Sequence, residues 1–85
     1  MEKRIGIVGI VVEDKQNVSE LNKILSEHSE LILGRMGLPQ RGSVNVIALI
    51  IEGSNEEVGA LTGKLGNLKG IKVRSTLTNH IVREE

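Results

Sequence analysis

The sequence predicts a single α+β domain over residues 1–85, in which strand, helix, strand, strand, helix and strand follow one another. Two short apolar runs, at residues 4–13 and 43–52, are apolar on both alternating faces, as strands buried on both sides are. Two other segments carry apolar residues three and four apart, which is typical of helices that pack by one face. Hydrophobic residues make up 39% of the chain and none is aromatic, so the core must consist mainly of branched aliphatic side chains, which favour strands.

The first predicted strand is residues 4–13, RIGIVGIVVE. The run is too short for a typical helix, is rich in β-branched residues, and ends in a charged segment. Its alternation divides the apolar side chains into two sets, with Ile5, Ile7 and Val11 on one face and Val8, Ile10 and Val12 on the other. Because both faces are apolar, we expect a central strand.

A helix is predicted over residues 17–28, where apolar side chains recur three and four apart from Val18 to Leu25. Asn17 and Glu20 have the spacing of a capping box, in which the first side chain accepts a backbone N–H and the second reaches back to the start. We therefore expect this helix to begin next to Asn17.

An edge strand and a second central strand are predicted to follow. Residues 30–38 run into Pro39, which cannot donate a hydrogen bond to a sheet, so they fit an edge. A hairpin connection at residues 39–42 leads to the second central strand, residues 43–52. Its two faces are both largely apolar and consist of Val44, Val46, Ala48 and Ile50 against Asn45, Ile47, Leu49 and Ile51.

The second helix is predicted to begin at Ser54, because Glu57 stands three residues later as in a capping box. Gly59 and Gly63 lie inside it, and a helical glycine costs about 1 kcal/mol relative to alanine. We interpret them as sites of close packing against the sheet or a neighbouring molecule. Residues 70–77 then alternate apolar with basic or hydroxyl side chains, which predicts a charged, protected edge strand.

This order of elements predicts a ferredoxin-like βαββαβ fold: a four-stranded antiparallel sheet with two helices on one face. The other face is then bare and apolar, and such a patch rarely stays exposed on a monomer. We therefore expect a homodimer or homotetramer. The predicted interface takes one apolar set from each central strand, namely Ile5, Ile7, Val11, Ile47, Leu49 and Ile51.

Composition excludes several functions. The formal net charge is zero, so no overall field attracts nucleic acid, and there is no aromatic side chain on which bases could stack. Direct nucleic-acid binding is not expected. The apolar run near the N-terminus is too short for a membrane span, so no membrane partner is expected. The chain has no cysteine, which fits a reducing compartment and predicts a cytoplasmic location.

No group of residues has the spacing of a catalytic site, so we predict a protein that is not an enzyme. No phosphate-binding glycine motif is present, and no cofactor is predicted. His28 and His80 are weak metal candidates, and His28 also suits a structural role at the end of a helix. Arg35 and Arg41 flank the predicted hairpin, where they could bind an anionic group or remain solvated charges.

Three stretches of the chain resemble a small bacterial family, the regulators of the iron-only hydrogenase system. They are RIGIVGIVVED at residues 4–14, ILGRMGLP at residues 32–39 and GALTGKLGNLKGIKV at residues 59–73. That family is similar to ACT domains and to the C-terminal domain of the nickel-responsive repressor. The resemblance covers nearly the whole chain and implies the same ferredoxin-like, ACT-like fold.

The resemblance also implies a regulatory or sensory role. ACT domains bind small molecules near the loop after the first strand, which places candidate ligand residues at Glu13, Asp14, Lys15, Gln16 and Asn17. This loop has no glycine, unlike the usual ACT loop, and the nickel regulators bind metal through histidine and cysteine, whereas this chain has no cysteine. From the regulatory role that the resemblance implies, we expect an oligomer that binds a small effector or a protein partner. The alternatives are a structural or maturation accessory protein without a ligand, and a metal-responsive switch.

Overall fold

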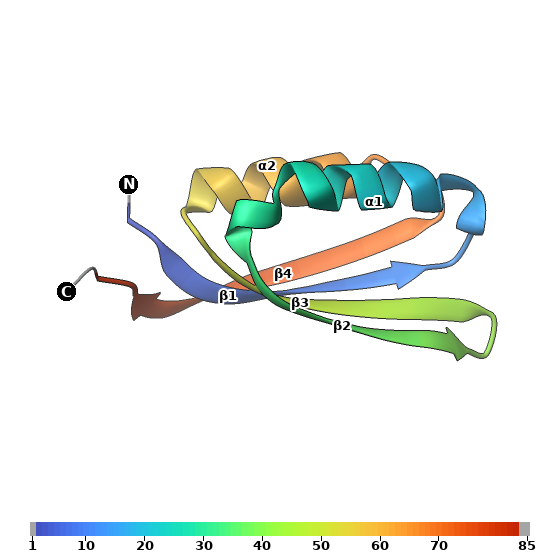
Figure 1. Cartoon of the computed structure of the whole chain (residues 1–85), viewed down its shortest axis with the longest axis horizontal. Helices are drawn as coiled ribbons and strands as arrows, with labels where there is room; N and C mark the ends of the chain where they lie inside the picture. The colour runs from blue at the N-terminus through green and yellow to red at the C-terminus, as the bar shows by residue number, and fades with distance from the viewer. Residues whose placement is uncertain (1, 84–85) are drawn as a thin grey trace.

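The protein folds as predicted, with two helices against one antiparallel sheet. The computed structural model describes residues 2–83, except for the side chains of residues 39–41. The elements in chain order are β1 (Arg4–Val12), α1 (Val18–Glu27), β2 (Ile32–Arg41), β3 (Val44–Gly53), α2 (Asn55–Gly66) and β4 (Ile71–Ile81), with short 3-10 turns at Lys15–Asn17 and Ser29–Leu31 (Figure 1).

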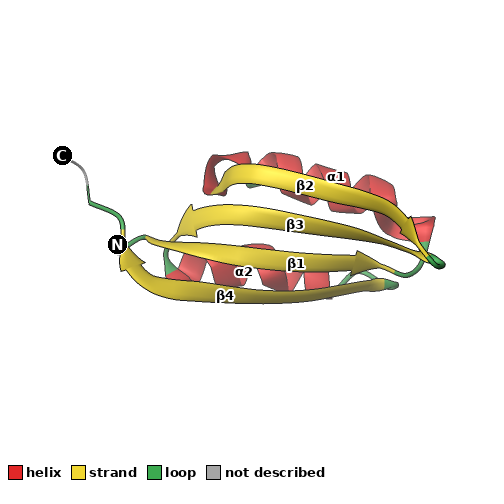
Figure 2. Ribbon diagram, turned by 90° about the horizontal axis from the view of Figure 1, so that it is seen from below, coloured by secondary structure: helices red, strands yellow, loops and turns green. Residues whose placement is uncertain are grey.

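The sheet has the order β2-β3-β1-β4, and every neighbouring pair is antiparallel. The predicted central strands, β1 and β3, are therefore central, and β2 and β4 are the edges. Both helices cover the same face (Figure 1), and the view from below shows the other face with no helix in front of it (Figure 2). The predicted fold class, α+β with a bare sheet face, is confirmed.

The hydrophobic core lies between the sheet and the helices. Val8 of β1 stands opposite Leu49 of β3, and both side chains are fully buried. The helices contribute one apolar stripe each, in which Leu21 of α1 and Leu61 of α2 are also excluded from solvent. Leu65 completes this layer. No aromatic residue is needed, because aliphatic side chains from the two layers fill the space.

One half of the predicted oligomer interface was assigned to the wrong face. Leu49 and Ile51 are completely buried beneath the helices, and Ile47 packs against the same core. Residues paired across neighbouring strands project to the same side of a sheet, and Leu49 pairs with Val8. Both faces of β3 are apolar, so its pattern alone could not show which face meets the helices. The register places Val46, Ala48 and Ile50 on the open face instead.

The hairpin between β2 and β3 is tighter than predicted. The turn is Gly42–Ser43 rather than residues 39–42, and β2 continues to Arg41, which pairs with Val44. Gly42 adopts a φ of 65°, the left-handed conformation that two-residue hairpins favour. Pro39 is accommodated because β2 is an edge strand.

The two helix starts differ. The capping box of α2 is present as predicted: the Glu57 N–H donates to Ser54 Oγ at 3.1 Å, and the Ser54 N–H donates to Glu57 Oε1 at 3.0 Å. At α1 the predicted box is wrong, because the Asn17 side chain donates to the Lys69 carbonyl at 2.9 Å. Asp14 caps the preceding 3-10 turn instead, accepting from the Gln16 N–H.

The helical glycines do not mark packing against the sheet. Gly59 and Gly63 lie on the exposed side of α2, and a Cβ added at either would meet no atom within 4 Å. The prediction of packing against the sheet is therefore wrong, and packing against a neighbouring molecule stays a prediction. Close approaches occur at other glycines: at Gly6, where an added Cβ would lie 2.6 Å from the Thr76 carbonyl oxygen, and at Gly70, where it would meet Asp14.

Candidate functional site

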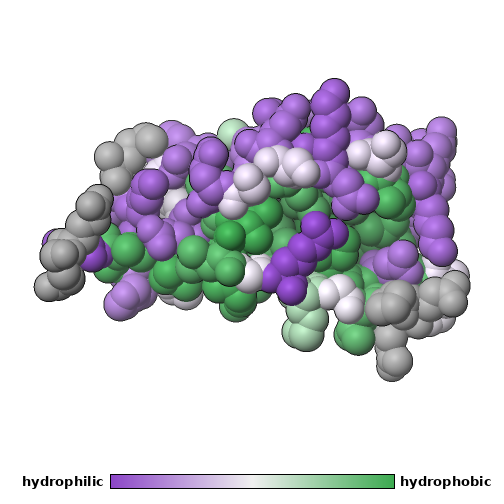
Figure 3. Space-filling model, in the orientation of Figure 1, coloured by the Kyte–Doolittle hydropathy of each residue, from purple (hydrophilic) through white to green (hydrophobic). Residues whose placement is uncertain are grey.

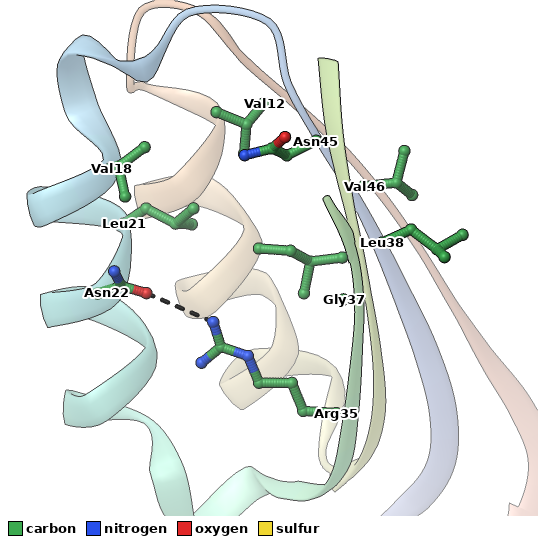
Figure 4. A pocket seen from close by; sticks show the side chains of 10 residues that line it. Val12, Val18, Leu21, Asn22, Arg35, Gly37, Leu38, Asn45 and Val46 are labelled. Atoms are coloured by element: carbon green, nitrogen blue, oxygen red, sulfur yellow. Dashed lines mark hydrogen bonds between the residues drawn. The ribbon is translucent and has the colours of Figure 1, made fainter. Parts of the chain in front are cut away.

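A groove opens between α1 and the hairpin of β2 and β3. It has a volume of about 250 Å³ (Figure 4). Apolar side chains and three polar ones line it: Val12, Val18, Leu21 and Ile47, with Asn22, Arg35 and Asn45. The groove exists because Gly37, which lies on the helix-facing side of β2 opposite Ile47, has no side chain to fill the space beside α1.

Arg35 crosses this gap from the sheet to the helix. Its neighbour across the ladder is Leu49, which faces the core, so the Arg35 side chain starts on the helix side of β2. The guanidinium Nη2 donates to Asn22 Oδ1 of α1 at 3.4 Å (Figure 4). Among the side chains that the structure describes, this long hydrogen bond is the only one that Arg35 makes. Its other N–H groups are therefore available to a ligand.

Arg35 also borders a second hollow of about 250 Å³ along the same seam, lined by Leu25, Ser26, Ser29 and Ile32. The guanidinium thus stands between two cavities at the α1–β2 seam. A planar cation with several donors is well suited to bind a carboxylate or phosphate through two parallel hydrogen bonds. The seam combines that donor with apolar walls on either side.

Asn22 and Asn45 are site residues that reasoning from sequence missed. Asn45 pairs with Val12 at the end of the central ladder, is half-buried, and extends beside Val12 into the groove (Figure 4). The sequence could have indicated Asn45, since it is the one amide side chain within the apolar run of β3. Asn22 gave no such signal, because polar residues are expected on the solvent side of any surface helix.

The predicted ligand loop, residues 13–17, lies beside the groove but does not line it. The N–H groups of Glu13 and Asp14 donate to the Gly70 carbonyl at 2.7 and 3.3 Å, and Asn17 bonds to Lys69. These contacts attach the loop to the turn after α2. The flanking residues Val12 and Val18 do line the groove.

Of the two arginines predicted for anion binding, Arg35 lines the groove, whereas the Arg41 side chain lies outside the described residues. Among the predicted loop residues, Lys15 and Gln16 are exposed in the 3-10 turn. The assignment of a ligand to any of these residues stays a prediction.

The two histidines lie on different elements. His28 follows the last residue of α1, and its backbone N–H donates to the Ile24 carbonyl at 3.1 Å. This bond does not involve the imidazole, so the structural role of that side chain stays a prediction. Its Nε2 lies 3.3 Å from Lys64 Nζ, and because an ammonium can only donate, the ring nitrogen accepts there. His80 lies near the end of β4. Within the described residues, no three His, Asp or Glu side chains gather as a metal site would require.

The open face of the sheet is a second candidate surface. Four of its large apolar side chains are exposed: Ile7 by 51%, Met36 by 66%, Leu38 by 52% and Ile50 by 42%. Figure 3 shows hydrophilic residues gathered over the helices and hydrophobic residues at the level of the sheet. No helix in the described part of the chain is long and apolar enough to cross a bilayer.

The fold is that of a small ACT-like domain, and solved structures share it. The ACT domain of GTP pyrophosphokinase from Chlorobium tepidum superimposes with a TM-score of 0.70 and 18% identity, over 87% of this chain and 86% of that one. The C-terminal domain of the MgtC protein from Mycobacterium tuberculosis has a TM-score of 0.69 and 11% identity, covering 95% of this chain and 94% of that domain. These likenesses show the fold.

The chain belongs to the TM1266-like family, described as "Iron-only hydrogenase system regulator, putative", whose pattern matches residues 4–75. The structure of the uncharacterized protein TM1266 from Thermotoga maritima is 40% identical, with a TM-score of 0.83, over 89% of this chain and 98% of that one. No curated protein matches the chain. The family predicted from the three sequence stretches is confirmed.

Proposed function

We propose that this protein is a non-enzymatic regulatory domain that binds a small effector in the groove between α1 and β2 and works as a homo-oligomer. The family's description as a regulator and the ACT-like fold support a regulatory role. The observation that carries the proposal is Arg35, whose guanidinium stands in an apolar groove with one long hydrogen bond to Asn22.

The groove favours a small anionic ligand with an apolar part. Arg35 would bind a carboxylate through two N–H groups, while Val18 and Leu21 would contact aliphatic carbons. Asn45 would orient a polar group deeper in the groove. A volume of about 250 Å³ suits a compact metabolite.

A thermal-shift screen of small carboxylates tests this proposal. A specific ligand at a hundredfold its dissociation constant stabilises the folded state by about 2.7 kcal/mol. Arg35→Met should abolish the shift, because the methionine keeps the aliphatic volume and removes every donor. Arg83→Met is the matched control, since Arg83 is exposed beyond the end of β4 and lines neither hollow at the seam. If no carboxylate stabilises the protein, or if both variants respond alike, the proposed site is wrong.

A structural or maturation accessory protein without a ligand is the second candidate, and the exposed apolar face of the sheet favours it. Such a protein would bind copies of itself or a protein partner and show no shift with any metabolite. The metal-responsive alternative has weaker support, because His28 faces the ammonium group of Lys64. Elemental analysis of the purified protein tests it, and stoichiometric metal lost on His28→Ala or His80→Ala would establish it.

A further inference from the structure

The strand register defines a regular surface on the open face of the sheet. Residues paired across strands form three rows, each running from β2 through β3 and β1 to β4. They are Leu38, Val46, Val11 and Lys72; then Met36, Ala48, Gly9 and Arg74; then Gly34, Ile50, Ile7 and Thr76. We call these twelve positions the open-face grid. Figure 4 shows Leu38 and Val46 projecting away from α1, as the register requires.

The open-face grid is asymmetric from one edge to the other. The nine positions on β2, β3 and β1 hold aliphatic residues, methionine or glycine, whereas the three on β4 hold Lys72, Arg74 and Thr76. A shallow hollow of about 370 Å³ lies over Gly9, between Val11 and these two cations. With strands about 4.8 Å apart and about 6.8 Å between rows, the grid covers about 400 Å² of flat area.

We propose that the open-face grid binds the same grid of a second copy, with the two-fold axis parallel to the strands, so that β4 of each copy lies on β2 of the other. The proposal rests on the homo-oligomeric part of the proposed function and specifies its geometry. In this arrangement Ile7 meets Ile50 of the second copy and Val11 meets Val46. Arg74 lies over Met36, and Lys72 lies over Leu38.

Charge favours this axis over a two-fold axis that runs across the strands. A two-fold axis running across the strands would place β4 on β4, with Arg74 opposite its own copy, and like charges would face each other at the interface. With the axis along the strands, the two cationic edges lie on opposite sides of the dimer. The long aliphatic stems of Lys72 and Arg74 then cover apolar side chains while their charged ends reach solvent.

A second copy fits this surface because the uncharged β2 column complements the long side chains of the β4 column. The most exposed apolar residue, Met36, is thereby covered by the stem of Arg74. The grid's flat area understates the accessible surface of its side chains, and a standard interface buries about 800 Å² on each partner. At about half of that value, the flat area of the open-face grid belongs with the small, weak interfaces rather than with the standard ones.

Cysteine crosslinking tests the arrangement cleanly, because the chain has no cysteine of its own. Chains carrying Met36→Cys and chains carrying Arg74→Cys are mixed and oxidised. We expect disulfide dimers containing one chain of each kind, and few dimers from either variant alone. Ala60→Cys, on the exposed side of α2, is the control for random collision and should not crosslink.

Light scattering at micromolar concentration is the second measurement. The native chain should have the mass of a dimer or tetramer. Ile50→Lys should break the open-face contact, so that a dimer becomes a monomer and a tetramer becomes a dimer, with an unchanged circular dichroism spectrum, since Ile50 is 42% exposed. Ala60→Lys should leave the mass unchanged.

The outcomes separate the two proposals. A monomeric native chain overturns the oligomer and its geometry together, whereas the effector groove is tested independently by ligand-induced thermal shifts. A stable dimer in which Arg74→Cys crosslinks to itself overturns only the proposed axis. A mass that rises only with acidic lipid vesicles or an acidic protein partner overturns self-association on this face.

Discussion

Replacing Gly70 by alanine should destabilise the fold more than any other glycine-to-alanine change in the loops. Gly70 follows α2 with a φ of 83°, a conformation that residues with a Cβ rarely adopt. An added Cβ would overlap the Asp14 Cβ and lie 3.2 Å from the Asp14 backbone N and Cα. The change therefore strains the chain at Gly70 and pushes away the loop that joins β1 to α1.

The expected magnitude follows from these two effects. Placing alanine in the left-handed region costs about 1–2 kcal/mol. Displacing the loop breaks the 2.7 Å hydrogen bond from the Glu13 N–H to the Gly70 carbonyl, a loss of about 1 kcal/mol. The sum of about 2–3 kcal/mol compares with a total stability of about 4–13 kcal/mol for a domain of this length. The melting temperature should fall by about 8–24 °C.

Two other glycines provide matched controls, measured by urea and thermal unfolding. Gly42→Ala also places an alanine at a left-handed φ, here 65°, but no atom lies within 4 Å of the new Cβ. This variant should therefore lose only the stability that the left-handed backbone conformation costs. Gly59→Ala, in the exposed face of α2, should stabilise by about 0.5–1 kcal/mol because it removes a helical glycine. A Gly70→Ala protein within 1 kcal/mol of the parent would show that the contact with Asp14 does not matter as described.

Three further predictions concern α2 and the core. Ser54→Ala should cost about 1–2 kcal/mol in urea unfolding, because it leaves the Glu57 N–H uncapped; an unchanged midpoint would contradict the capping box. The hydrogen bond from the Ser54 N–H holds the pKa of Glu57 below its ordinary 4.5. The ionised Glu57 carboxylate therefore contributes fully to stability above pH 4.5, and this contribution is lost as the pH falls through the pKa of Glu57 in the folded state. When the pH is lowered below 4.5, the Glu57→Gln variant should therefore lose less stability than the parent protein. Acid-unfolding curves that fall in parallel for the two proteins would contradict this. Leu61→Ala should cost about 2–5 kcal/mol because Leu61 is fully buried, whereas Leu33→Ala, at a side chain 57% exposed, should cost less than about 1 kcal/mol.

The order of elements was predictable because each left a strong local signal. β1 and β3 are continuous apolar runs, and Ser54 with Glu57 form the predicted cap. The cap at Asn17 failed for a reason that is not local. A short 3-10 turn precedes α1, and the Asn17 amide finds the Lys69 carbonyl, which is remote in sequence. A spacing rule cannot include a partner brought near by folding.

The face of β3 was the main error, and its cause is physical. Alternation shows which residues share a face but cannot show which face meets the helices when both are apolar. The pairing of Val8 with Leu49 decides that question, and it depends on the register between two strands far apart in sequence. The groove was missed for the same reason, since α1 and β2 form it only after the chain has folded. Arg35 was singled out, whereas Asn22 and Asn45 were not.

β2 links the two candidate surfaces, because neighbouring residues in a strand point to opposite faces. Arg35 projects into the groove, and Met36 projects into the open-face grid. The two surfaces would be coupled by a ligand that binds Arg35 and also shifts the backbone of this edge strand, which is paired on one side only. The same movement shifts Met36 and Leu38, which the proposed dimer buries. If ligand binding and dimerisation are coupled in this way, the coupling is reciprocal. The ligand then changes the dimerisation constant by the same factor by which dimerisation changes the affinity for the ligand. Dilution experiments with and without ligand would measure that factor, and a value of one would show that β2 does not transmit the signal.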